Sequence, residues 1–169
     1  FCYGKQQDYG KEFSDPESVT KYRAAVTQYL NFKDTILNKV DDFCVSNFNG
    51  KRVVSLHKRG TDQFTSRGHA GPMQQLDDSR LSSIVEDYLK NYDAVFLATD
   101  EHKVYELLRQ RFGNKIISYS TMRSAEGDNR GTHFGHINDT AKNKFLLGEE
   151  AIIDFLLMSR CSYSLCMKS

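Results

Sequence analysis

The sequence lacks the features that mark several large classes of protein. Its 169 residues carry a formal net charge of only +1, whereas a general binder of nucleic acid or of anionic membrane surfaces needs a strong basic excess. No apolar run approaches the roughly 20 residues that a membrane-spanning helix requires. No signal peptide follows Phe1, so we expect a piece of a longer protein, and nucleic acid is not an expected partner.

Cysteine motifs and nucleotide-binding motifs are absent as well. The four cysteines form no C-x-x-C pair and no zinc-like spacing, so no metal site is expected. Neither a G-x-G-x-x-G stretch after the first strand nor a P-loop is present, which disfavours the common dinucleotide and NTP sites. The triplet 138–140 matches a glycosylation acceptor, but such triplets are frequent by chance, and the compartment stays open.

The most informative stretch that is present covers residues 51–63, KRVVSLHKRGTDQ. Its apolar run predicts a strand buried on both faces, and charged residues follow the run directly. Open α/β sheets bind their ligands at this carboxyl end of the strands. A guanidinium such as that of Arg59 can hold phosphate oxygens, and an acid such as Asp62 can hold the guanidinium, so an anionic ligand is expected.

Helical and strand patterns alternate along the chain. Residues 1–15 are expected to be a linker or loop, and residues 16–169 one α/β domain, a Rossmann-like parallel sheet with flanking helices. A polar stretch at 120–146 is expected to be a functional or mobile loop. Helices are predicted from Pro16 to Tyr29, at 32–43, 77–89, 104–112 and 149–158, and strands at 53–56, 94–98, 115–119 and 163–167.

Three segments in order resemble fucosyltransferases of the α-1,6 and nodulation type, in a superfamily that includes protein O-fucosyltransferases. Residues 57–62 (HKRGTD) resemble the family's H-x-R-x-T-D stretch, and residues 95–101 (VFLATDE) its "YLATDD" strand end. Residues 151–169 resemble its final helix and strand. The resemblance implies the donor-binding half of a GT-B fold, with a missing N-terminal domain completing the site.

The resemblance also implies a metal-independent reaction with GDP-fucose as donor and a glycan or protein hydroxyl as acceptor. Arg59 matches the arginine that faces the β-phosphate as negative charge develops on the leaving group, and Asp62 could orient it. Gly60 stands where α-1,6 members have a second arginine, which implies one lost contact. Lys58 is expected to point to the opposite face from Arg59.

Four further positions match donor-binding residues of the family. His57 matches a guanine contact, with a backbone-bonded histidine as the alternative, and Asp154 matches the acid that accepts hydrogen bonds from guanine. An acid inside the apolar run 152–156 is costly unless it has a ligand or a specific partner. Asp100 corresponds to an acid near the donor, although a helix cap explains it equally well. Ser169 falls near a serine pair on the β-phosphate.

The general base is the weakest part of the pattern. No acid follows the first motif before Asp77 and Asp78, which look better as helix caps, and His69 lies in a loop. Two hypotheses therefore remain: an inverting, fucosyltransferase-like enzyme, or a non-catalytic nucleotide- or glycan-binding module of the same fold.

Overall fold

The computed structural model describes residues 16–58, 77–119 and 141–166. The chain divides into two compact units, Phe1–Leu37 and Asn38–Ser169. In the first unit, helix α2 (Pro16–Tyr29) begins at the proline where the sequence predicts it, with Glu17 in its first turn. Residues 1–15 lie outside the described residues, and a single domain over 16–169 stays a prediction.

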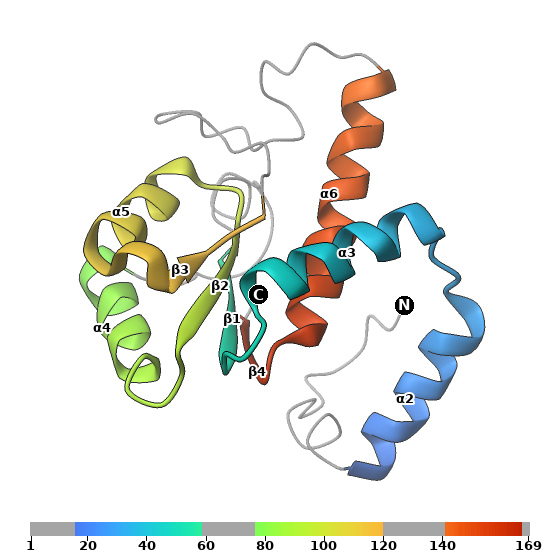
Figure 1. Ribbon diagram of the computed structural model, residues 1–169, viewed down its shortest axis with the longest axis horizontal. Helices are drawn as coiled ribbons and strands as arrows, with labels where there is room; N and C mark the ends of the chain where they lie inside the picture. The colour runs from blue at the N-terminus through green and yellow to red at the C-terminus, as the bar shows by residue number, and fades with distance from the viewer. Residues whose placement is uncertain (1–15, 59–76, 120–140, 167–169) are drawn as a thin grey trace, which may run out of the picture. The chain divides into compact units, whose positions relative to one another are not determined.

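The second unit is built on a parallel sheet of four strands, in the order β3-β2-β1-β4 (Figure 1). The central strand β1 (Val53–Lys58) pairs along its whole length with β2 (Ala94–Thr99). On its other side β1 pairs with β4 (Tyr163–Cys166), and β3 (Ile116–Ile117) pairs with the outer side of β2. The predicted α/β, Rossmann-like sheet is confirmed.

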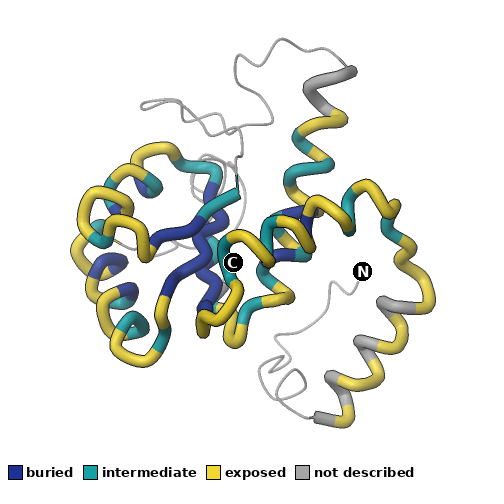
Figure 2. Tube along the Cα trace, viewed as in Figure 1, coloured by how far each residue is buried: buried dark blue, intermediate teal, exposed yellow. Residues whose placement is uncertain are grey.

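Helices α4 (Asp78–Tyr88) and α5 (His102–Phe112) cover one face of this sheet (Figure 1). Alternate strand residues point to this face because successive side chains of a strand alternate between its two sides. Together with the helices they form one buried cluster, which stabilises the unit by removing apolar surface from water (Figure 2). Its members are Val54, Leu56, Leu81, Val85, Val95, Leu97, Val104, Leu108 and Ile116.

Helices α3 (Asp34–Asn47) and α6 (Ala141–Arg160) belong to the opposite face. Phe96 of β2 points to this face and meets the rings of Phe43 and Phe48 edge-on, with ring centroids 6.1 and 5.6 Å apart. Two ion pairs join the helices at their surface, Lys39 with Glu149 and Asp41 with Arg160. The fully buried residues of these helices are Val40, Ile153 and Leu157.

Two predicted elements differ most from the structure. The third strand covers only two residues, because Lys115 belongs to a 3₁₀ turn (Gly113–Lys115) and the Ser118 hydroxyl donates to the Leu97 carbonyl where the ladder stops (2.8 Å). Helix α6 begins at Ala141, inside the stretch expected to be a loop. Where burial is described in this added segment, Phe145 is 63% and Leu146 37% exposed, so these two residues give no buried apolar stripe that periodicity could reveal.

Within the described ranges, no helix has both the length and the apolar character needed to cross a bilayer. This agrees with the sequence-based expectation for this chain. The compartment in which the protein works is a separate question.

Candidate functional site at the carboxyl edge of the sheet

The strand order places a topological switch point at the carboxyl ends of β1 and β4. From β1 the sheet continues to β2 and β3 on one side, while β4 lies on the other side. The last paired positions of these two strands are His57 and Cys166. Ligands of open α/β sheets bind in the crevice outside such a point, so the candidate site lies at this edge.

Three of the predicted site residues, Arg59, Asp62 and Ser169, lie outside the described residues. Arg59 follows directly on Lys58, the last residue of β1, and Ser169 comes three residues after the end of β4. Their roles stay predictions. The two strands after which they come are neighbours in the sheet.

His57 is half-buried and lies on the α3/α6 side of β1. The side is established by Ser55, two residues earlier on the same face of the strand. The Ser55 hydroxyl donates to the Ser164 hydroxyl (2.7 Å), which itself donates to the carbonyl of Met158 in α6 (3.4 Å). His57, the last but one residue of β1, therefore points toward the layer that contains α6.

Asp154 lies on the same side of the sheet, one helical turn before Met158. Only Cys161 and Ser162 separate α6 from β4, so the helix runs back along the sheet in the opposite direction to the strands. Four residues back along α6 is about 6 Å, and the step from Ser55 to His57 is about 6.6 Å, both toward the carboxyl edge. His57 and Asp154 are thus the next residues toward this edge after the hydrogen-bonded link of Ser55, Ser164 and Met158.

The surroundings of Asp154 fit the expectation of a specific partner rather than a solvated acid. The residue is half-buried, and its Oδ1 atom is enclosed by protein. Its neighbour Ile153 is fully buried against the sheet. A carboxylate in such a place is costly unless donors face it, so its environment is that of a binding or bonded group.

Asp100 follows β2 at the same edge and is half-buried. The cap position of α5 is occupied by the next residue, Glu101, whose backbone N–H donates to the Thr99 hydroxyl (3.2 Å). Asp100 is thus the residue before the N-cap of α5. The side chain of Glu101 forms no cap hydrogen bond, because it points elsewhere.

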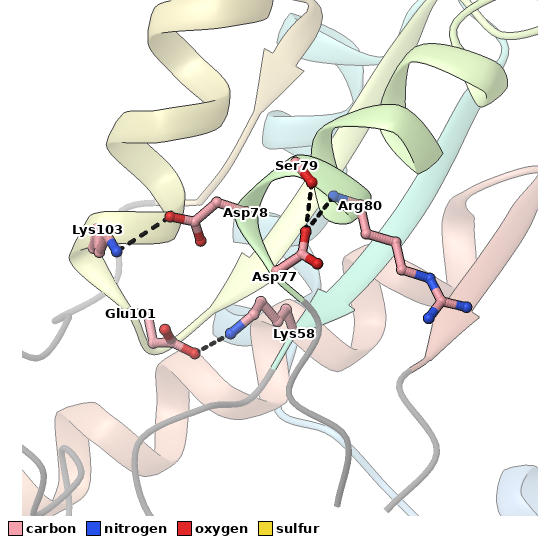
Figure 3. Close-up of polar contacts among 7 residues, drawn as sticks. All are labelled: Lys58, Asp77, Asp78, Ser79, Arg80, Glu101 and Lys103. Atoms are coloured by element: carbon pink, nitrogen blue, oxygen red, sulfur yellow. Dashed lines mark hydrogen bonds and ion pairs between the residues drawn. The ribbon is translucent and has the colours of Figure 1, made fainter.

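The carboxylate of Glu101 pairs with the ammonium of Lys58, a contact that the sequence did not predict (Figure 3). The side chain of Lys58 is only 4% exposed, and that of Glu101 is 20% exposed. Alternation along β1 did indicate that Lys58 points away from the His57 face. The sequence signal that was missed is Glu101, the acid directly after Asp100. Because β1 pairs with β2 up to Thr99, this acid lies beside the end of β1.

The two acids considered as general bases have structural partners at the start of α4 (Figure 3). Asp77 is the N-cap, and its carboxylate accepts the backbone N–H of Arg80 (2.7 Å) and the Ser79 hydroxyl (2.7 Å). These hydrogen bonds lower the pKa of Asp77, which weakens it as a base. Asp78 pairs with Lys103 of α5 (3.1 Å). The expectation that both act as helix caps is confirmed for Asp77 and wrong for Asp78, which is the first residue of α4 and pairs with α5.

The residues after β3 complete this edge. The Ser118 hydroxyl bonds the Leu97 carbonyl, as strand-end polar residues often do, and the Tyr119 ring packs edge-on against Phe43 (5.5 Å). Over the described ranges, no three His, Cys, Asp or Glu side chains gather as a set of metal ligands. The described edge therefore offers a histidine, carboxylates and a buried lysine.

Comparison with solved structures found the same fold in a protein of known activity. The chain matches the crystal structure of NodZ alpha-1,6-fucosyltransferase co-crystallized with GDP, with a TM-score of 0.56 and 16% sequence identity. The match covers 90% of this chain but only 42% of that protein. No family model and no curated protein matches the sequence. The chain thus has a fucosyltransferase-like fold.

Proposed function

We propose that this chain binds a GDP-sugar, GDP-fucose in the first instance, at the carboxyl edge between β1 and β4. One observation carries the proposal: hydrogen bonds through Ser164 link Ser55 of β1 to the Met158 carbonyl of α6 beside the switch point of the sheet, and His57 and Asp154 follow on these two elements toward the carboxyl edge. The structural match supports it, because that fucosyltransferase was crystallized with GDP. A carboxylate that accepts from guanine N1 and N2 selects guanine over adenine.

The proposed reaction is an inverting transfer of fucose. The acceptor hydroxyl attacks the anomeric carbon from the face opposite the nucleotide, the bond from that carbon to the β-phosphate oxygen breaks, and GDP leaves with the electron pair. Arg59 stabilises the charge that gathers on the β-phosphate, and Asp62 orients Arg59. Asp100 and Ser169 contact the donor, and the charge stabilisation requires no metal ion.

The proton of the acceptor hydroxyl must pass to a base that neither Asp77 nor Asp78 provides. The first is engaged by two hydrogen bonds at the start of α4, and the second by Lys103. In the proposed enzyme the base comes from outside the described residues or from a further N-terminal domain. The acceptor is a hydroxyl of a glycan or of a protein.

The lack of a free general base among Asp77 and Asp78 favours a second candidate, a nucleotide- or glycan-binding module without turnover. A chain whose two nearest acids serve a helix start, and whose Gly60 replaces an arginine, can retain a nucleotide site and lack catalysis. Both candidates bind GDP. They differ in whether GDP-fucose is consumed in the presence of an acceptor.

Calorimetric titration with GDP, ADP and UDP, without added metal, tests the site. The wild-type chain is expected to bind GDP with a micromolar Kd and the other two at least tenfold more weakly. Arg59→Ala and Asp154→Asn should each weaken GDP binding at least tenfold, since they remove a phosphate contact and a guanine acceptor. The control Asp87→Asn changes an exposed carboxylate of α4 and should leave the Kd unchanged.

Equal binding of all three nucleotides, or of none, contradicts a guanine-selective site in this chain. If Asp154→Asn binds GDP as tightly as wild type, Asp154 of α6 does not bind the guanine base. Release of GDP from GDP-fucose with a panel of glycan acceptors then separates the enzyme from the module. A chelator in the same assay should leave the rate unchanged.

A further inference from the structure

A buried ion pair joins the ends of the two central strands at the edge where the nucleotide is proposed to bind. Lys58 is the last residue of β1, and Glu101 is the residue that opens α5 after β2 (Figure 3). Both groups are largely shielded from water, with Lys58 more so than Glu101. A shielded lysine is rare without a partner, because loss of its hydration is costly.

The Lys58–Glu101 pair lies at the turn between β2 and α5. The residues of this turn are Thr99, Asp100 and Glu101, and the Glu101 N–H donates to the Thr99 hydroxyl within it (3.2 Å). The Glu101 side chain takes no part in capping α5, although a cap residue usually bonds the first free N–H groups of its helix. The carboxylate is instead directed across to β1.

We infer that Lys58 is a positioning residue, which acts through Glu101 to hold the β2–α5 turn, and with it Asp100, in the geometry that receives the GDP-sugar. The inference rests on the proposed function. Asp100 lies between two anchored residues, Thr99 in the sheet and Glu101 in the ion pair. A carboxylate fixed in this way loses less conformational entropy when it bonds a ligand, which increases affinity.

Stability alone does not explain the pair. Replacing both partners of a buried ion pair by neutral groups of similar size is often neutral or stabilising, because the desolvation cost of the charges disappears with them. Removing a pair that serves only stability should therefore leave ligand binding unchanged. Removing a pair that positions the turn should weaken ligand binding.

The double variant Lys58→Met/Glu101→Gln tests the inference, since methionine keeps the unbranched chain of lysine without its ammonium group, and glutamine keeps the length of glutamate without its charge. Its thermal midpoint should stay within a few degrees of wild type. Amide hydrogen exchange of residues 99–104, measured without nucleotide, should rise at least tenfold, and the Kd for GDP at least tenfold. The matched control is Glu86→Gln/Arg111→Met, which removes an exposed ion pair between α4 and α5 (2.9 Å) and should change neither quantity.

A milder variant keeps the test decisive if the double variant does not fold. Glu101→Asp retains both charges but withdraws the carboxylate by one methylene, and should weaken GDP binding several-fold with the thermal midpoint preserved. If a folded Lys58 or Glu101 variant shows the wild-type amide hydrogen exchange over residues 99–104, or the wild-type affinity for GDP, the inference is wrong. If the wild type does not bind GDP at all, the proposed function fails, while the exchange comparison still decides whether the pair orders the turn.

Discussion

At the residue scale, Cys161 shows how the fold changes the chemistry of an ordinary thiol. It is a free cysteine whose S–H donates to the Leu157 carbonyl (3.4 Å). Burial is the main cause that raises its pKa to about 12, and the nearby Cys44 thiol adds to the effect. Since the thiolate is the reactive form, a thiol with this pKa is almost inert near neutral pH.

Alkylation of Cys161 by iodoacetamide at pH 8 should therefore be roughly thirty- to a hundredfold slower in the folded protein than in the denatured chain. A thiolate fraction reduced by about three orders of magnitude is partly offset by the greater nucleophilicity of a more basic thiolate. Mass spectrometry of the tryptic peptides at timed intervals gives the rate. Equal rates in the two states would show that Cys161 is accessible and unshifted.

Asp77 gives a residue-scale prediction about pH. Its folded pKa lies below the ordinary 3.8 because of the Arg80 N–H and the Ser79 hydroxyl. The folded state thus binds fewer protons than the unfolded state, so the stabilisation is complete above pH 3.8 and is lost as the pH falls below it. Asp77→Asn keeps an N-cap acceptor without this titration, so its thermal midpoint should match wild type at pH 7 and decline less toward pH 3.

Asp77→Ala is the companion variant, because it removes the acceptor altogether. Its thermal midpoint should fall by a few degrees at pH 7. If wild type and Asp77→Asn lose stability in parallel between pH 5 and pH 3, the carboxyl does not titrate as its hydrogen bonds require.

At the element scale, α3 shows how one helix divides its residues between core and solvent. Val40 is fully buried, whereas Val45, five residues later, is 70% exposed. Five residues correspond to about 500° of rotation, which turns a side chain to the other side of the helix. Identical residues on this helix therefore contribute very differently to stability.

Val40→Ala should lower the free energy of unfolding by about 1.5–3 kcal/mol, since it removes buried methyl groups and leaves a cavity. Val45→Ala should change it by less than about 0.5 kcal/mol, and the better helix propensity of alanine acts in its favour. Urea titration of both variants measures the difference. Equal losses would mean that the exposed position is covered by another part of the protein.

The element boundaries show where sequence patterns succeed and fail. β1 and β2 were predictable because both faces of these strands are covered, and this leaves an apolar run. The capped start of α4 and the end of α5 at Gly113, where φ is +60°, were predictable from local chemistry. The early start of α6 was not, since its first turns leave apolar residues exposed.

At the scale of the whole molecule, the proposed site predicts that GDP stabilises the fold. A ligand that binds only the folded state adds about 2.7 kcal/mol at a hundredfold excess over Kd. For a chain of this length, the thermal midpoint should rise by about 5–10 °C with GDP and by much less with ADP at the same concentration. Scanning fluorimetry measures both shifts. Equal shifts would remove the case for guanine selectivity.

The sequence by itself determined the strand–helix alternation, the buried central strands and the polar residues that follow them. These features depend on interactions between near neighbours and on burial, which composition and spacing record directly. Only the tertiary structure decided which residues meet: that the Ser164 hydroxyl of β4 accepts from Ser55 of β1 and donates to the Met158 carbonyl of α6, and that Lys58 pairs with Glu101. Strand order and the partner of a buried charge arise from contacts between distant segments, for which a single sequence has no periodicity.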